Sequence, residues 1–205
     1  MALHQPKKFD LKLEGISDQQ ISNHRDILYV GYVNKLNEIE ERQRSVDFSK
    51  ANQTFSDLRS VKTDETFALN GVVLHELYFE NLMGGKGTKP SGKLSDLIAK
   101  EFGSFDKWTE QFKACGMAAR GWVIMALNIY DGKIHNYCLD AHNDKVPFNV
   151  IPILIMDVYE HAYFLDFGAK RQPYIDAFFK NINWNACSQR LERINISQIS
   201  KEAAS

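Results

Sequence analysis

Apolar residues recur at helical spacing in two stretches of the N-terminal part of the chain. A spacing of three and four residues places them on one face of a helix. The pattern predicts a long helix over residues 27–42 and a second over residues 65–82. The second stretch is apolar nearly all round, so we expect it to be buried on most sides. The polar stretch between them, residues 45–64, is typical of the connection in a helical hairpin.

A short helix and an extended arm are predicted to precede the hairpin. Ser17 and Gln20 have the spacing of a capping box, in which the serine oxygen accepts the backbone N–H three residues further on. This spacing predicts a short helix over residues 16–24. Residues 1–15 are polar and lack helical periodicity, so we expect an extended arm there.

The second half of the chain mixes helices with strands. A glycine-rich breaker over residues 83–92 predicts the boundary between a helical-hairpin domain, residues 1–88, and an α+β domain, residues 93–205. Asp131-Gly132 is a hairpin-turn signal between two apolar runs. The elements expected are helices over residues 93–102 and 104–120, strands over 121–130, 133–139 and 150–156, and helices from 159 to near 168, over 173–179 and over 184–194. The predicted fold class is α+β, with a long helical hairpin followed by a three-stranded antiparallel sheet and flanking helices.

Composition excludes several classes of protein. The 205 residues are 44% hydrophobic, enough for a sizeable core, and the net charge of −1 argues against nucleic-acid binding. No apolar run approaches the ~20 residues of a membrane-spanning helix, and the first residues lack the apolar core of a secretion signal. Three cysteines without a C-x-x-C pair favour a reducing, cytoplasmic setting.

Candidate chemistry begins where the third predicted strand ends. Residues 150–156 are an apolar run, and the carboxylate of Asp157 follows directly. A buried charge costs several kcal/mol unless it is paired or bound to a cation. If a helical turn starts at Asp157, then His161 lies on the same face, and the two side chains form half of a metal site. The alternative, an N-capping aspartate and a hydrogen-bonded core histidine, is equally open.

Two further histidines fall on the predicted helices, whereas His4 and His135 are expected at the surface. His24 lies at the start of the first long helix, and His75 lies among apolar residues in the middle of the second. A lone histidine there is more often a hydrogen-bonded core residue than a ligand. Three imidazoles and one carboxylate are nevertheless a suitable donor set for iron or manganese. Periodicity alone does not show that these residues meet in space.

Short motifs spread along nearly the whole chain carry a resemblance to a known family. The sequence D-V-Y-E-H-A-Y over residues 157–163 is similar to D-x-W-E-H-A-Y, the signature of the iron/manganese superoxide dismutases. His24 precedes Tyr32 by eight residues, and H-E-L-Y-F over residues 75–79 matches H-x-x-Y-W/F, as in that family. Further segments that match lie at residues 103–105, 121–122, 171–174 and 183–184.

The resemblance implies a metal site, an activity and a fold. Its ligands would be His24, His75, Asp157 and His161, and the ion would lie between a helical hairpin and an α/β domain. One iron or manganese ion per subunit would be the cofactor, with iron slightly favoured and both accepted. Superoxide would be the substrate, converted to dioxygen and hydrogen peroxide.

The resemblance also implies catalytic residues around the ion. Tyr32 would stand at the mouth of the channel and join a proton relay. Trp122 and Tyr159 would wall the site, and Arg171 would give the anion a positive entrance. His142 aligns where the manganese enzymes place a glutamine, and it would hydrogen-bond the solvent on the metal. Because a histidine titrates near pH ~6.5, activity would then depend more steeply on pH. For Tyr32 and Trp122, packing in the core is the alternative.

The family is usually dimeric, and this chain departs from its pattern at the subunit contact. Glu160, which in the family reaches a ligand histidine of the partner subunit, is present beside His161. A polar His–Tyr pair common at that contact is replaced by Leu28 and Phe164. The paired replacement indicates an apolar version of the same contact, next to Tyr163, in a homodimer.

Other departures leave rival functions open. Gly71 stands where the iron enzymes usually place a glutamine, and we expect His142 to fill the space that it leaves. One rival is a family-like metalloprotein of the stress response, for example in chromate resistance, with weak or altered dismutase activity. The others are a mononuclear iron oxygenase, which needs open coordination positions, and a non-catalytic helical interaction module.

Overall fold

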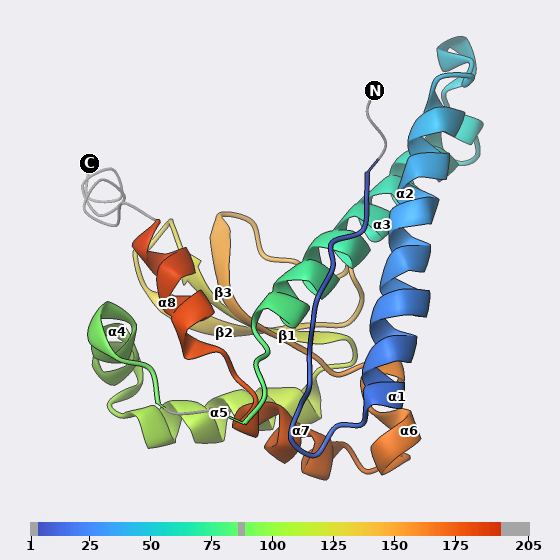
Figure 1. Ribbon diagram of the computed structural model, residues 1–205. Coiled ribbons are helices and arrows are strands. Elements are labelled where there is room, and N and C mark those ends of the chain that lie inside the picture. Colours follow the sequence, from blue (N-terminus) through green and yellow to red (C-terminus); the bar gives the residue numbers. More distant parts are fainter. Residues whose placement is uncertain (1–3, 86–88, 194–205) are drawn as a thin grey trace.

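The computed structural model describes residues 4–85 and 89–193 (Figure 1). Two long helices form a hairpin that projects from one side of a small sheet, and shorter helices surround the sheet. The predicted fold class is therefore confirmed. Among the described residues, no helix combines the length and the apolar composition needed to cross a membrane.

The first half of the hairpin is one continuous helix in three parts. α1 (Asp18–Ser22) passes into the π-helical η1 (Asn23–Tyr29), and α2 (Val30–Gln43) continues it. The prediction of two separate helices is wrong at their junction, because the backbone stays right-handed helical there. A π-helical stretch accommodates an extra residue without ending the helix. His24 lies in this stretch and is buried.

The second hairpin helix, α3 (Asp57–Glu80), begins earlier than predicted. Ser56 caps it, because its side chain accepts the N–H of Arg59, so the later part of the predicted connection is helical. The helix is also less buried than expected, since Leu69 is 44% exposed and Val73 is 42% exposed. Its apolar residues thus lie on two faces. One face packs against α2, and the other is exposed at the surface.

Three antiparallel strands form the sheet in the order β2-β1-β3. Their bounds are Trp122–Asn128 for β1, Ile134–Leu139 for β2 and Val150–Asp157 for β3. Pro152 lies inside β3, where the register against β1 shifts, and an edge strand tolerates its missing N–H there. The pairing brings Trp122 at the start of β1 opposite Asp157 at the end of β3.

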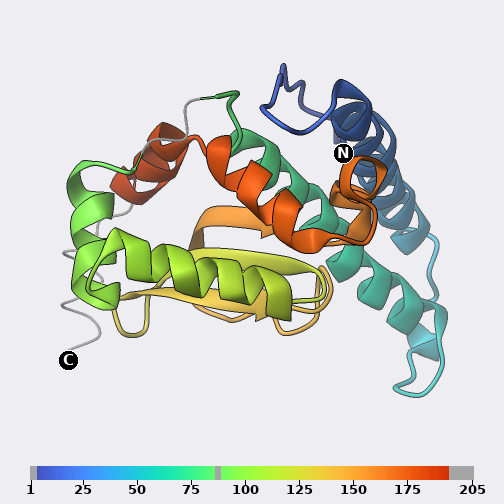
Figure 2. The same cartoon turned by 90° about the horizontal axis from the view of Figure 1, so that it is seen from below.

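Helices pack around the sheet, and the predicted helices of the second half are present. The remaining bounds are η2 (Phe48–Lys50), α4 (Gly92–Phe102), α5 (Phe105–Ala118), η3 (Glu160–Ala162), α6 (Phe164–Phe167), α7 (Arg171–Lys180) and α8 (Trp184–Glu192). α5 packs against β1 and β2, whereas α3 and α8 pack against β3. Figure 2 looks onto α5, which covers the strands and runs roughly along them.

The N-terminal arm crosses the segment that leads from the hairpin to the sheet. A Cβ added at Gly84 would lie 1.9 Å from the carbonyl oxygen of Lys12. Further along the arm, Nε2 of His4 lies 2.8 Å from a carboxylate oxygen of Glu40 on α2. The arm therefore binds the hairpin at one end and passes over the segment that follows α3 at the other.

Two predictions fall partly outside the described residues. The expected domain boundary includes residues 86–88, and the last predicted helix and the tail extend into residues 194–205. The division into domains of residues 1–88 and 93–205 stays a prediction.

Replacing Gly84 by alanine is predicted to destabilise the protein, because the new Cβ and the Lys12 carbonyl oxygen cannot occupy the same space. A loss of about 2 kcal/mol is expected from forced backbone movement, which lowers the midpoint of thermal unfolding by about 4–8 °C. Gly31→Ala is the matched control, since a Cβ there meets nothing within 4 Å and lies in α2. Equal midpoints for the two variants would contradict the close approach.

Candidate metal centre

Four side chains from four separate elements converge where the hairpin meets the sheet. They are His24 from η1, His75 from α3, Asp157 from β3 and His161 from η3, and their ligand atoms all lie within 4.8 Å of one another. Nε2 of His24 and Nε2 of His161 each lie 3.0 Å from Oδ2 of Asp157. Nε2 of His75 lies 3.6 Å from the same oxygen. The donor set expected from the sequence is therefore assembled in space.

Asp157 reaches the cluster from a strand end rather than from a helix. The N–H of Tyr159 donates to Oδ1 of Asp157 at 2.9 Å, which turns the chain from β3 into η3. The helical turn at Asp157 on which the shared face depended does not form, because β3 runs to Asp157 and η3 starts at Glu160. The turn that does form still brings His161 back to the carboxylate, and Oδ2 is left to face the imidazoles.

The nitrogens of the cluster point toward a common centre. Nδ1 of His75 donates to the carbonyl oxygen of Gly71 at 2.6 Å, which leaves Nε2 of the neutral ring unprotonated. The Nε2 atoms of His24 and His75 are buried and make no hydrogen bond within the described part of the chain. Two ligands about 2.1 Å from one ion and at right angles are ~3 Å apart, much as His24 and Asp157 are. These residues therefore fit one iron or manganese ion.

Burial and the Asp157 carboxylate set the charges in the cluster. Burial lowers the pKa of His24 and lowers that of His75 well below its usual value, so both rings are neutral. Burial alone would raise the pKa of Asp157, but His161 and His24 lower it overall, and the carboxylate is ionised. Burial also opposes the charged form of His161, but the attraction of Asp157 outweighs it and raises the pKa. A bound cation would take the place of a proton on His161.

Sequence reasoning assigned Gln20 to a helix cap and missed its contact with the centre. Oγ of Ser17 does accept the Gln20 N–H at 3.1 Å, as predicted. The buried Gln20 side chain donates to the carbonyl oxygen of His161 at 2.6 Å and accepts the Leu165 N–H at 3.1 Å. Because Gln20 lies one helical turn before His24, it ties two ligand-bearing segments together. The spacing of four residues from His24 is the only signal in the sequence that could have indicated this.

His142 connects Tyr32 to Trp122 beside the cluster. Nε1 of Trp122 donates to Nδ1 of His142 at 2.9 Å, so the proton of the neutral imidazole resides on Nε2. That nitrogen lies 2.7 Å from the hydroxyl oxygen of Tyr32 and donates to it. Both ring nitrogens are thus used within the protein. The expected hydrogen bond from His142 to solvent on the metal is not the contact that the structure shows.

The surroundings of His142 also correct its expected titration. Burial lowers the pKa of His142 to about 4, so the ring is neutral at physiological pH. A histidine with this pKa does not titrate near pH 6.5, so it gives no reason to expect the steep pH dependence. Burial raises the pKa of Tyr32 to about 12, so its phenol keeps the proton.

Tyr32, rather than His142, fills the space beside Gly71. A Cβ added at Gly71 would lie 2.7 Å from Cδ1 of the Tyr32 ring. The three atoms nearest to that Cβ all belong to Tyr32, and none belongs to His142. The absence of a side chain at Gly71 lets α2 and α3 approach closely enough for Tyr32 to lie beside His75, with ring centroids 5.2 Å apart.

Trp122 and Tyr159 lie against the cluster, as expected. The Trp122 ring is fully buried and stands nearly perpendicular to the His75 ring, with centroids 5.0 Å apart. The Tyr159 ring stacks on His161 at 5.1 Å. These two aromatic rings also contact each other at 6.4 Å.

Arg171 reaches the centre only through intermediates. Its guanidinium donates to the carbonyl oxygen of Ala119 at 2.6 Å and to the hydroxyl of Tyr163 at 3.3 Å. Tyr163 stacks on Tyr174 at 4.9 Å, and the hydroxyl of Tyr174 donates to the backbone carbonyl of Asp157 at 2.6 Å. Arg171 thus stabilises the packing of Tyr163 and Tyr174 behind the Asp157 carboxylate.

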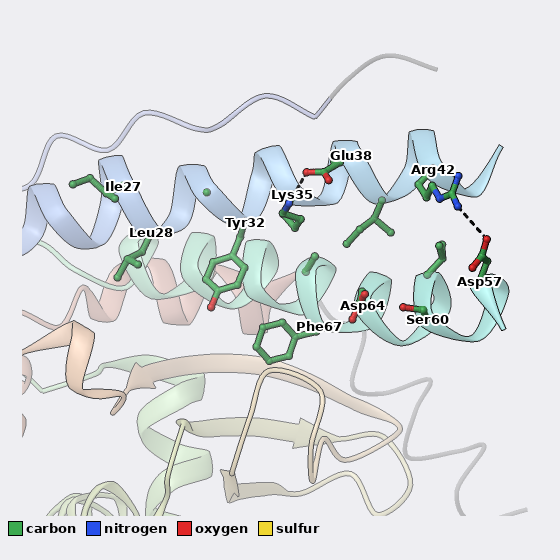
Figure 3. Close-up of a pocket in the computed structure, with 14 residues that line it drawn as sticks. Ile27, Leu28, Tyr32, Lys35, Glu38, Arg42, Asp57, Ser60, Asp64 and Phe67 are labelled. Carbon is green, nitrogen blue, oxygen red and sulfur yellow. Dashed lines mark hydrogen bonds and ion pairs between the residues drawn. The ribbon is translucent and has the colours of Figure 1, made fainter. Parts of the chain in front are cut away.

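A groove of about 620 Å³ runs between α2 and α3 on the hairpin (Figure 3). Tyr32 and Phe67 line it, and both also contact His142. Charges of both signs line it further out, where Arg42 and Asp57 pair at 3.0 Å. The groove therefore leads along the hairpin to Tyr32 and does not reach the four ligands.

The residues expected at a subunit contact differ in exposure. Phe164 is 51% exposed, Glu160 is exposed and Leu28 is half-buried. Tyr163 is buried within the chain itself. The side chain of His161 is 24% exposed, whereas the other three ligands are fully buried. The centre is thus least covered beside Glu160 and His161.

Comparison with known proteins gives concordant matches. Residues 90–190 match the family described as iron/manganese superoxide dismutases, C-terminal domain. The chain is 50% identical over 185 residues to an iron superoxide dismutase of Aquifex pyrophilus, a match that covers 88% of this chain and 86% of that one. It is 31% identical over 188 residues to a manganese superoxide dismutase of Halobacterium salinarum, covering 92% of each chain. By its sequence along most of its length, the chain belongs to the iron/manganese superoxide dismutase family.

Proposed function

We propose that this chain is a superoxide dismutase, which converts two superoxide ions and two protons to dioxygen and hydrogen peroxide. The observation that carries the proposal is the convergence of His24, His75, Asp157 and His161 on one point. Membership of the iron/manganese family supports it, since relatives that match most of the chain are named for this activity.

Four protein ligands would hold the ion. Iron or manganese, when bound, supplies the redox chemistry by accepting an electron from one superoxide ion and giving it to a second. His24, His75 and His161 contribute neutral imidazoles, and Asp157 contributes the single negative charge of the ligand set. Gln20 and the Gly71 carbonyl keep the ligand segments in position from outside.

Tyr32 and His142 would deliver protons to the forming peroxide. The Tyr32 hydroxyl accepts the Nε2–H of His142, so its own proton is free to be donated into the site. Trp122 fixes the tautomer of His142 through Nδ1. Trp122 and Tyr159 would exclude bulk water, and Arg171 would support the Asp157 backbone from behind through Tyr163 and Tyr174.

Iron is the proposed cofactor, with manganese as an acceptable substitute. The relatives at 50% and 49% identity are named for iron, whereas those at 31% are named for manganese. The same three imidazoles and one carboxylate suit either ion.

The rival functions are not favoured. Relatives along most of the chain are named as dismutases, which argues against the stress-response metalloprotein with altered activity. An oxygenase with three ligands leaves positions for a co-substrate, whereas four side chains converge here. A non-catalytic helical module gives no reason for these buried nitrogens.

A cytoplasmic homodimer is the proposed state of the protein. The three cysteines are free thiols, as in a reducing compartment. The dimer contact would use Leu28, Phe164 and Glu160, and it would cover the exposed edge of His161. Tyr163 would support this surface from inside the chain.

The protein loaded separately with iron and with manganese is predicted to dismutate superoxide in at least one form. His75→Ala removes a buried ligand, so metal content by elemental analysis should fall from about one ion per chain by roughly tenfold or more. His135→Ala is the matched control, because His135 pairs with Asp131 at the surface. Inactivity in both metal forms would refute the dismutase proposal. Full metal content in His75→Ala would show that His75 is not a ligand.

Dismutase activity should show no step from His142 between pH 5 and 8, because its pKa lies at about 4. His142→Gln can keep both hydrogen bonds, since Oε1 can accept from Trp122 and Nε2 can donate to Tyr32. Its pH profile is predicted to run parallel to that of the parent. His142→Ala loses both bonds, and we expect its rate to fall by about tenfold or more.

Unfolding gives an independent check on the same group. The unfolded histidine has its ordinary pKa near ~6.5, so unfolding takes up a proton between pH 4 and 6.5. As the pH is lowered from 6.5 to 4, the free energy of unfolding of the parent should therefore decrease by more than that of His142→Gln. A step near pH 6.5 in the activity of the parent alone would contradict the low pKa.

Phe164→Glu is predicted to dissociate the dimer, because it places a charge in an apolar contact. We expect the dissociation constant from sedimentation to rise by roughly 100-fold, as for a central contact residue. Phe148→Glu is the control, since Phe148 is 97% exposed in the loop before β3. An unchanged constant for Phe164→Glu would show that the subunits meet elsewhere.

A further inference from the structure

Two cysteines outside the metal centre are in contact on the sheet. Cys115 belongs to α5 and Cys138 to β2, and both are half-buried. The thiol of Cys138 donates to the backbone carbonyl oxygen of Cys115 at 3.7 Å. The third cysteine, Cys187, is buried in α8 and contacts Asn81 instead.

The register of α5 along β2 holds this thiol pair in place. About two helical turns before Cys115, the indole of Trp108 donates to Oδ1 of Asn136 at 3.1 Å. Nδ2 of Asn136 in turn donates to Gln111 at 2.7 Å. Positions 136 and 138 face the same side of the strand, and positions 108, 111 and 115 share one side of the helix. The thiol contact therefore continues a seam that two hydrogen bonds already fix.

The pair is also accessible to a small oxidant. β2 is an edge strand of the sheet, and neither thiol is fully buried. Hydrogen peroxide is close to water in size, so it can reach a half-buried sulfur.

We propose that Cys115 and Cys138 form an oxidation site for hydrogen peroxide, which closes to a disulfide within the chain. The source of the peroxide rests on the proposed function, because dismutation of superoxide releases it from the same molecule.

Cys138 is the thiol that peroxide oxidises first. Burial raises the pKa of Cys115 to about 12, and negative charge on Cys138 contributes to the rise. Because the thiolate is the nucleophile toward peroxide, the buried Cys115 is the poorer first nucleophile of the pair, and the first attack falls to Cys138. Cys115 keeps its proton until the second step.

The reaction balances without a further reagent. The Cys138 thiolate attacks one peroxide oxygen, the O–O bond breaks, and hydroxide leaves and takes up a proton to become water, which gives a sulfenic acid. The Cys115 sulfur then attacks the Cys138 sulfur, the S–O bond breaks, and the Cys115 proton leaves with the hydroxide as water. Two thiols lose two electrons to one peroxide, and two waters form.

The test treats the metal-loaded protein with hydrogen peroxide, then denatures it and alkylates the remaining thiols. We expect alkylated thiols to fall from three per chain to one, and the mass before alkylation to fall by about 2 Da. Peptide mapping should give a Cys115–Cys138 cross-link that dithiothreitol reverses. Cys187→Ser, the matched control, should form the same cross-link. In Cys115→Ser, dimedone should trap a sulfenic acid on Cys138.

Three retained thiols, a pairing that involves Cys187 or a disulfide between two chains would overturn the proposal. The order of attack would be overturned if dimedone labels Cys115 in Cys138→Ser but does not label Cys138 in Cys115→Ser. Because peroxide is added as a reagent, these outcomes do not depend on dismutase activity. If the cross-link forms in a protein that lacks dismutase activity, the oxidation site stands and only the proposed source of the peroxide is refuted.

Discussion

The structure depends on a carboxylate that has no access to water. Asp157 is fully buried at the end of β3, and an ionised carboxylate in such a place needs compensating charge within hydrogen-bond distance. The imidazoles of His24, His75 and His161 surround it and supply nitrogen rather than a permanent positive charge. A dication or trication supplies that charge, so the same arrangement that is costly without an ion becomes favourable with one. Metal binding is then coupled to folding, because the ligands come from both halves of the chain.

This requirement explains features of the backbone that otherwise have no clear purpose. The π-helical turn η1 keeps a continuous helix while it directs His24 inward. The Asx-type contact of Tyr159 with Asp157 turns the chain so that His161 returns to the carboxylate. Gln20 fastens the turn to the helix that carries His24. Each of these backbone features positions one ligand side chain. Together they restrict the conformations of the ligands, which an ion would otherwise have to restrict on binding.

Local patterns predicted the elements well and their boundaries less well. Hydrophobic spacing, the Asp131-Gly132 turn and the cap at Ser17 gave the hairpin, the antiparallel sheet and most helices. The π-helical junction near His24 escaped prediction because it keeps helical dihedrals and changes only the hydrogen-bond step. The start of α3 was missed because Ser56 lies in a polar stretch whose helical part is solvated. The exposed Leu69 and Val73 show that apolar spacing reports capacity for burial, which tertiary packing uses only in part.

The candidate site shows the same limit at the level of single residues. The four ligands were expected only once motifs distant in sequence were considered together, since no periodicity joins His24 to Asp157. His142 was assigned an ordinary titration because sequence shows residue type and not environment. Its ring is buried, accepts a hydrogen bond on Nδ1 and donates one from Nε2, so it offers one donor and one acceptor and stays neutral. A carboxamide side chain offers the same pair of groups. A glutamine in place of His142 would therefore keep the hydrogen-bond pattern around Tyr32, and the pH-sensitive chemistry of histidine is suppressed by its surroundings.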